Sequence, residues 1–104
     1  MGFFSFLDFG GNTIKESLRR GAVIIDVRSA PEYDRGKIRD SKNIPVDQIP
    51  LNARYIKGLN KPVILVSSPD SRSADAKRIL KEKGVAEVYN GGGWERVLRL
   101  IQSL

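Results

Sequence analysis

The chain has 104 residues, of which 18 are basic and 12 are acidic, and its formal net charge is +6. This length suits one domain with a single hydrophobic core, and 40% apolar with 29% charged residues is ordinary for a soluble globular protein. The chain contains no cysteine and no histidine, which excludes disulfides, thiolate chemistry, the usual general base near neutral pH and the commonest metal ligand. We therefore expect neither a metal nor another cofactor.

The basic surplus is spread over several segments, and aromatic residues make up only 8% of the chain. A nucleic-acid site would gather basic residues around stacking rings, so we interpret the charge as a solvated surface. No apolar run reaches the roughly 18 residues that span a bilayer. Residues 1–11 are predicted to form an apolar arm folded onto the domain, with a membrane or partner contact as the alternative, and 12–104 a single domain. We expect a cytoplasmic monomer.

Helical and extended patterns alternate along the chain. In order, they predict a helix from Thr13 to Gly21, a strand over 22–27, a helical turn from Ser29 to Gly36, a short strand over 43–45, a helix from Asp47 to Leu59, a strand over 63–66, a helix from Arg72 to Lys83, a strand over 85–89, a flexible turn over 90–93 and a helix from Trp94 to Leu104. Thr13 and Glu16 have the spacing of a capping box, and Asp47 is a candidate helix cap. This alternation implies an α/β domain with a mostly parallel sheet covered on both faces.

The stretch from Lys61 to Ser73 is predicted to hold the functional site. Its apolar, β-branched run is typical of a strand buried on both faces, and a helix follows directly. A loop between such a strand and a helix N-terminus collects unpaired backbone N–H groups at the positive end of the helix dipole, which favours an anion. The candidate residues are Ser67, Ser68, Pro69, Asp70, Ser71, Arg72 and Ser73.

Ligands of open α/β sheets bind beyond the carboxyl ends of the strands. Asp26–Arg28 and Gly91–Gly93 also follow predicted strands, so we expect them to lie along the same edge as the candidate loop. Arg28 and Glu32 are spaced to form a structural ion pair across a turn, and Trp94 is expected to anchor the last helix in the core.

One set of motifs runs through the chain: Val23–Arg28 with Glu32 and Tyr33, then Gly36 with Ile38, then Asn43–Pro45, Arg72 with Ser73, and Gly91–Trp94. Together these motifs resemble the rhodanese, or thiosulfate sulfurtransferase, family. The resemblance covers nearly the whole chain after the arm. It implies a rhodanese-like, five-stranded, mostly parallel open sheet with helices on both faces and a pocket at the central loop.

The resemblance also implies a sulfur-transfer reaction, for which this chain lacks the cysteine sulfur atom. In the family, a cysteine takes the outer sulfur of thiosulfate as a persulfide and passes it to an acceptor such as cyanide or a thiol. That nucleophile position falls on Ser67, five residues before Arg72, and the family's usual glycine falls on Asp70. Lys37 stands where the family usually has histidine.

These departures predict that sulfur transfer through the loop is absent. The pKa of a serine hydroxyl lies near that of water, so far above neutral pH that even a large downward shift leaves the hydroxyl protonated. Without an adjacent base Ser67 is a poor nucleophile, and oxygen cannot form a persulfide. Asp70 is interpreted as a local cap whose carboxylate takes the amides that an anion would occupy, while Arg72 and Lys37 would favour the anion.

Three functions stay open. The first is a catalytically inactive rhodanese-like domain that acts as a binding or scaffold module for an unknown protein partner, or that is an engineered variant. The second is a thiosulfate sulfurtransferase whose loop was mutated or redesigned. The third is a site at Ser67 that binds a small anion, namely sulfate, phosphate or thiosulfate, or that hydrolyses weakly.

Overall fold

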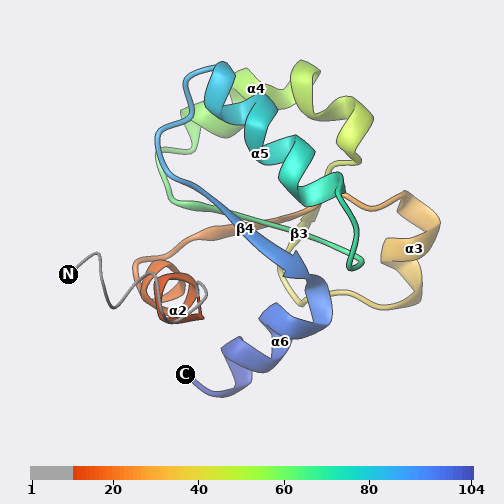
Figure 1. Ribbon diagram of the computed structural model, residues 1–104, viewed down its shortest axis with the longest axis vertical. Helices are drawn as coiled ribbons and strands as arrows, with labels where there is room; N and C mark the ends of the chain where they lie inside the picture. Colours follow the sequence, from red (N-terminus) through yellow and green to blue (C-terminus); the bar gives the residue numbers. More distant parts are fainter. Residues whose placement is uncertain (1–10) are drawn as a thin grey trace.

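The computed structural model describes residues 11–104, so the predicted N-terminal arm lies outside this part of the chain except for its last residue (Figure 1). Four strands form one sheet: β1 (Val23–Asp26), β2 (Lys42–Asn43), β3 (Val63–Ser67) and β4 (Val88–Gly93). Their spatial order is β2-β1-β3-β4, and every neighbouring pair is parallel. The predicted α/β architecture is confirmed. The resemblance implied five strands, whereas residues 11–104 contain four.

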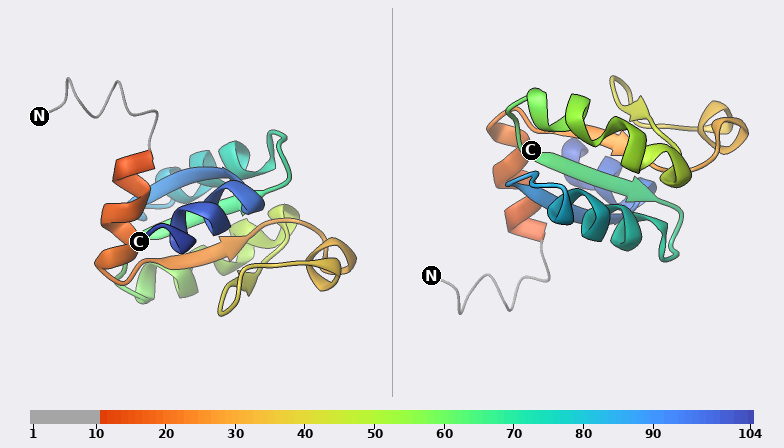
Figure 2. Two further views of the ribbon diagram at one scale, coloured as in Figure 1. Left: turned by 90° about the horizontal axis from the view of Figure 1, so that it is seen from below. Right: turned by 90° about the horizontal axis from the view of Figure 1, so that it is seen from above.

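Helices cover both faces of the sheet. α4 (Ile49–Gly58) and α5 (Arg72–Glu82) lie on one side, and α2 (Gly11–Arg19) and α6 (Trp94–Gln102) lie on the other (Figures 1 and 2). The short helix α3 (Ala30–Arg35) and the 3-10 helix η1 (Val46–Gln48) complete the described elements. No helix within residues 11–104 is both long and apolar enough to cross a membrane.

The two core layers arise from the alternation of side chains along the strands. Ile25 and Leu65 pack with α4 and α5, whereas Ile24, Ile64 and Val66 pack with α2 and α6. Successive residues of a strand point to opposite faces, so an uninterrupted apolar run serves both layers. Residues 63–66 of β3 are completely buried, which makes this strand the centre of the domain.

Two predicted caps are wrong. α2 already includes Gly11, so Thr13 lies inside the helix and its carbonyl accepts a hydrogen bond from the Ser17 hydroxyl at 3.0 Å. Asp47 lies within η1, and α4 starts after it without a side-chain cap. In both cases buried side chains, such as Ile14 in α2 and Ile49 in α4, hold the first turns in the core, so neither helix depends on the predicted cap.

The last strand also differs from its prediction. The pattern placed it at residues 85–89 with a flexible turn over 90–93, but β4 runs from Val88 to Gly93 and pairs with β3 as far as Ser67. Gly91 forms a bulge in this ladder, between the residues that pair with Leu65 and Val66. The glycines are therefore strand residues, and they allow β4 to approach its neighbours closely.

Candidate functional site

The carboxyl edge of the sheet gathers the segments that the sequence placed there. Asp26 of β1 pairs with Val66 of β3, and Ser67 pairs with Gly93 of β4. The loop that follows Ser67 therefore lies between the connection after β1 and the junction of β4 with α6. The predicted common edge is confirmed by this register.

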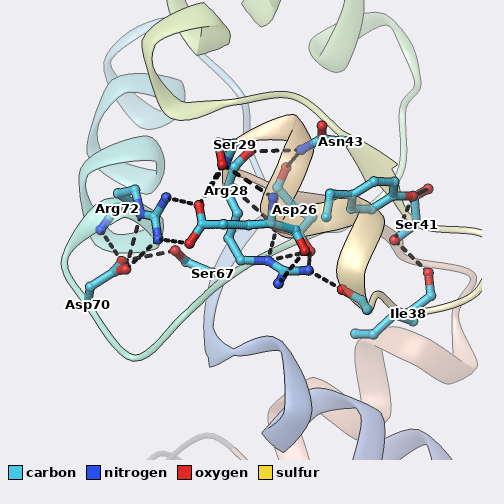
Figure 3. Close-up of polar contacts among 12 residues, drawn as sticks. Asp26, Arg28, Ser29, Ile38, Ser41, Asn43, Ser67, Asp70 and Arg72 are labelled. Carbon is cyan, nitrogen blue, oxygen red and sulfur yellow. Dashed lines mark hydrogen bonds and ion pairs between the residues drawn. The ribbon is translucent and has the colours of Figure 1, made fainter.

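Ser67 is the last residue of β3, and it is completely buried. Its hydroxyl donates a hydrogen bond to Oδ1 of Asp70 at 2.9 Å (Figure 3). The same carboxylate oxygen accepts the backbone N–H of Arg72 at 3.0 Å, at the first turn of α5. Asp70 thus folds back into the loop and takes a helix N-terminal amide, as the interpretation of a local cap predicts.

Arg72 holds two carboxylates at once. Its Nη2 is 2.7 Å from Oδ2 of Asp70 (Figure 3). Its Nη1 is 2.7 Å from Oε1 of Glu32, and a second contact of 3.1 Å joins Nη2 to Oε2 of Glu32. Hydrogen bonds from Arg72, followed by those from Ser29, lower the pKa of Glu32 to about 2. Arg72 is also the main cause that lowers the pKa of Asp70, and the two carboxylates together raise the pKa of Arg72.

Glu32 is held in place by the start of α3. Ser29 is the N-cap residue of this helix, and its hydroxyl accepts the N–H of Glu32, while the Glu32 carboxylate accepts the N–H of Ser29 at 3.0 Å. This capping box fixes the side chain that reaches Arg72. This ion pair joins residues 40 positions apart, and it is not among the contacts expected from the sequence. The shared edge of β1 and β3 is the signal from which it could have been inferred.

The predicted ion pair between Arg28 and Glu32 is wrong. Arg28 instead pairs with Asp26 at 2.8 Å, and both side chains are almost fully buried. Its guanidinium also donates to the carbonyl of Gly36 at 2.7 Å and lies 4.9 Å from the ring centre of Trp94. A buried cation needs a partner that compensates its lost hydration. Asp26, the last residue of β1, is that partner for Arg28.

Trp94 is half-buried and packs against the core layer of α2 and α6, as expected of an anchor for the last helix.

The remaining candidate residues of the loop differ in their surroundings. Ser68 is half-buried, whereas Pro69 and Ser71 are exposed. Ser73 is 1% exposed, and its hydroxyl has no hydrogen-bond partner within the described residues. Lys37 was expected to favour an anion at the loop, but its ammonium lies 4.9 Å from the ring centre of Tyr33. No ion pair joins Lys37 to the loop in residues 11–104.

This arrangement defines a class of protein, an α/β domain whose candidate loop joins a central parallel strand to a helix N-terminus. Residues 12–99 match the rhodanese-like domain family. The chain belongs to this family.

Among relatives, the protein YqhL of Bacillus subtilis (strain 168) is 36% identical over 78 residues, which are 74% of this chain and 61% of that protein. The chain therefore matches less than two thirds of that relative's length. Thiosulfate sulfurtransferase GlpE of Pseudomonas fluorescens (strain SBW25) is 33% identical over 79 residues, 73% of this chain and 70% of that enzyme. Among solved structures, a rhodanese with anions from E. coli is 28% identical, with a TM-score of 0.66 over 73% of this chain and 91% of that one.

Proposed function

We propose that this rhodanese-like domain does not transfer sulfur and instead works as a binding or scaffold module. The observation that carries the proposal is the hydrogen bond from the Ser67 hydroxyl, at the family's nucleophile position, to the Asp70 carboxylate at 2.9 Å. Hydrogen bonds from Arg72 lower the pKa of Asp70, so this carboxylate is too weak a base to remove the hydroxyl proton at neutral pH. The chain has no thiol that could carry a persulfide.

The test is turnover of thiosulfate and cyanide, combined with mass spectrometry of the intact chain after exposure to thiosulfate. We expect the same rate as without protein and no added sulfur atom, because the chain has no thiol and the Asp70 carboxylate is too weak a base to activate Ser67. Turnover above that background, or a covalently bound sulfur atom, would contradict the proposal.

The alternative is a sulfurtransferase whose loop was changed, naturally or by engineering. The similarity to a thiosulfate sulfurtransferase and the presence of Arg72 at the end of the loop support it. The double variant Ser67→Cys with Asp70→Gly separates the two functions. A persulfide with turnover would show an enzyme scaffold that lost its nucleophile, and an inert variant would show that the pocket itself has diverged. Ser68→Cys with Asp70→Gly is the matched control, since its thiol stands one residue away from the end of β3.

The second candidate function is binding of a small anion at the same loop. The hydroxyl of Ser73, which is buried and has no hydrogen-bond partner among residues 11–104, and the N-terminus of α5 favour it. The related E. coli rhodanese was solved with anions. In this chain the Asp70 carboxylate competes for the same N–H and guanidinium groups. We therefore expect sulfate to shift the amide resonances of residues 67–73 more strongly in Asp70→Gly than in the wild type. The absence of any shift at millimolar sulfate in both proteins would exclude this function.

A further inference from the structure

The side of the domain that α4 and α5 cover carries two hollows that meet at Lys57. One, of about 420 Å³, is lined by Pro50, Leu51, Ala53, Arg54, Lys57 and Lys83. The other, of about 290 Å³, lies between Lys57 and the residues that precede β3 and β4, such as Lys61 and Glu87. We call the two hollows together the α4–α5 groove. Because it extends to the amino ends of parallel strands, it lies toward the edge of the sheet opposite Ser67.

The charge of this groove is positive and uncompensated. Arg54, Lys57, Lys61 and Lys83 make no ion pair with any residue in the described part of the chain. Glu87 also lines the groove, but its carboxylate binds Arg20 at 2.8 Å. Four cations along these two neighbouring hollows attract an anionic partner, and the attraction is stronger in a hollow than on a flat surface.

The groove also offers apolar surface to water. Leu51 is 86% exposed, and the neighbouring Pro50 is exposed as well. A single exposed leucine is unremarkable, but here it borders a hollow that has Arg54 and Lys57 on its rim. A matching partner must therefore supply both carboxylates and an aliphatic side chain.

We propose that the α4–α5 groove docks an acidic amphipathic segment of a partner protein. The carboxylates of this segment bind Arg54, Lys57, Lys61 and Lys83, and the apolar side chains of the segment cover Leu51. A nucleic acid would satisfy the cations but would leave Leu51 without an aliphatic partner. This inference rests on the proposed binding role of the domain, and it assigns that role to a surface distinct from the Ser67 loop.

Fluorescence anisotropy with two labelled helical peptides tests the proposal. One peptide carries glutamate and leucine at amphipathic spacing, and the other has lysine in place of every glutamate. We expect the acidic peptide to bind and the basic peptide not to bind. The variant Arg54→Glu with Lys57→Glu should weaken binding by at least about tenfold, and Leu51→Ala should weaken it severalfold.

The control Arg19→Glu with Arg99→Glu changes the same charge on α2 and α6, and it should leave the affinity nearly unchanged. All these residues are exposed, and the thermal midpoint of each variant shows that it is folded. Amide shifts of the wild-type domain should locate the acidic peptide on α4 and the end of α5.

Three results would overturn the inference: no binding of the acidic peptide, an equal loss of affinity in the control variant, or tighter binding of a single-stranded DNA oligonucleotide than of the peptide. The sulfur-transfer assay on the same preparations keeps the two proposals apart. Sulfur transfer would contradict the proposed function. If neither sulfur transfer nor peptide binding occurs, only the proposed docking at the α4–α5 groove is contradicted.

Discussion

At the scale of single residues, the site is organised by Arg72. It binds Asp70 of its own loop and Glu32 of α3, so the positive charge that could receive an anion is already neutralised by two internal carboxylates. All three side chains are about one third exposed, and water therefore screens the pairs. We infer that this cluster mainly orders the loop and adds little to global stability.

Through Glu32, this cluster makes the stability of the fold depend on pH. The pKa of Glu32 falls from 4.5 to about 2 on folding. Its contribution to the free energy of unfolding is therefore present above pH 4.5 and is lost as the pH falls through about 2. We expect the difference in thermal midpoint between the wild type and Glu32→Gln to be constant above pH 4.5 and to shrink below it. Glutamine keeps a side-chain oxygen for the Ser29 amide, which limits the loss of the cap. A difference that stays constant down to pH 2 would contradict the ion pair.

At the scale of elements, β4 shows how a glycine run serves as a strand. An added Cβ at Gly91 would lie 2.8 Å from Cγ2 of Val97 and 3.0 Å from Cγ2 of Ile64, so a side chain does not fit between β3 and α6. Gly92 follows with a φ of 76°, which glycine adopts without strain. The bulge lets β4 continue its pairing up to Gly93, opposite Ser67.

We therefore predict that Gly91→Ala destabilises the domain by about 1–3 kcal/mol, because the new methyl group overpacks the core. Urea unfolding followed by circular dichroism measures the free energy. Gly58→Ala is the control, since nothing lies within 4 Å of its added Cβ and the residue is helical. The control should be neutral or stabilising by up to about 1 kcal/mol. Equal effects of the two substitutions would show that Gly91 is not closely packed.

At the scale of the whole molecule, the domain consists of two apolar layers divided by one sheet. The Ser67 loop lies at the carboxyl edge, and the α4–α5 groove extends to the amino edge. The two apolar layers between them stabilise the domain. Leu80 of α5 is completely buried in one of these layers, whereas Leu51 of α4 is 86% exposed.

This contrast gives a prediction for two leucines on adjacent helices. Leu80→Ala should lower the free energy of unfolding by about 2–5 kcal/mol, because it leaves a cavity under α5. Leu51→Ala should change it by less than about 0.5 kcal/mol, although it should weaken docking at the groove. Denaturant unfolding of both variants checks this, and a large loss in Leu51→Ala would place that side chain in the core.

The sequence by itself determined the order of strands and helices, the central strand, the loop after Ser67 and the absence of a sulfur nucleophile. These features depend on local periodicity and residue chemistry, which are visible in a single chain. Only the tertiary structure decided that Glu32 binds Arg72 and that Arg28 pairs with Asp26 instead of Glu32. It also decided that Gly91 belongs to a strand. Those outcomes depend on which strands become neighbours and how closely they pack, because residues 40 positions apart meet only when β1 lies beside β3.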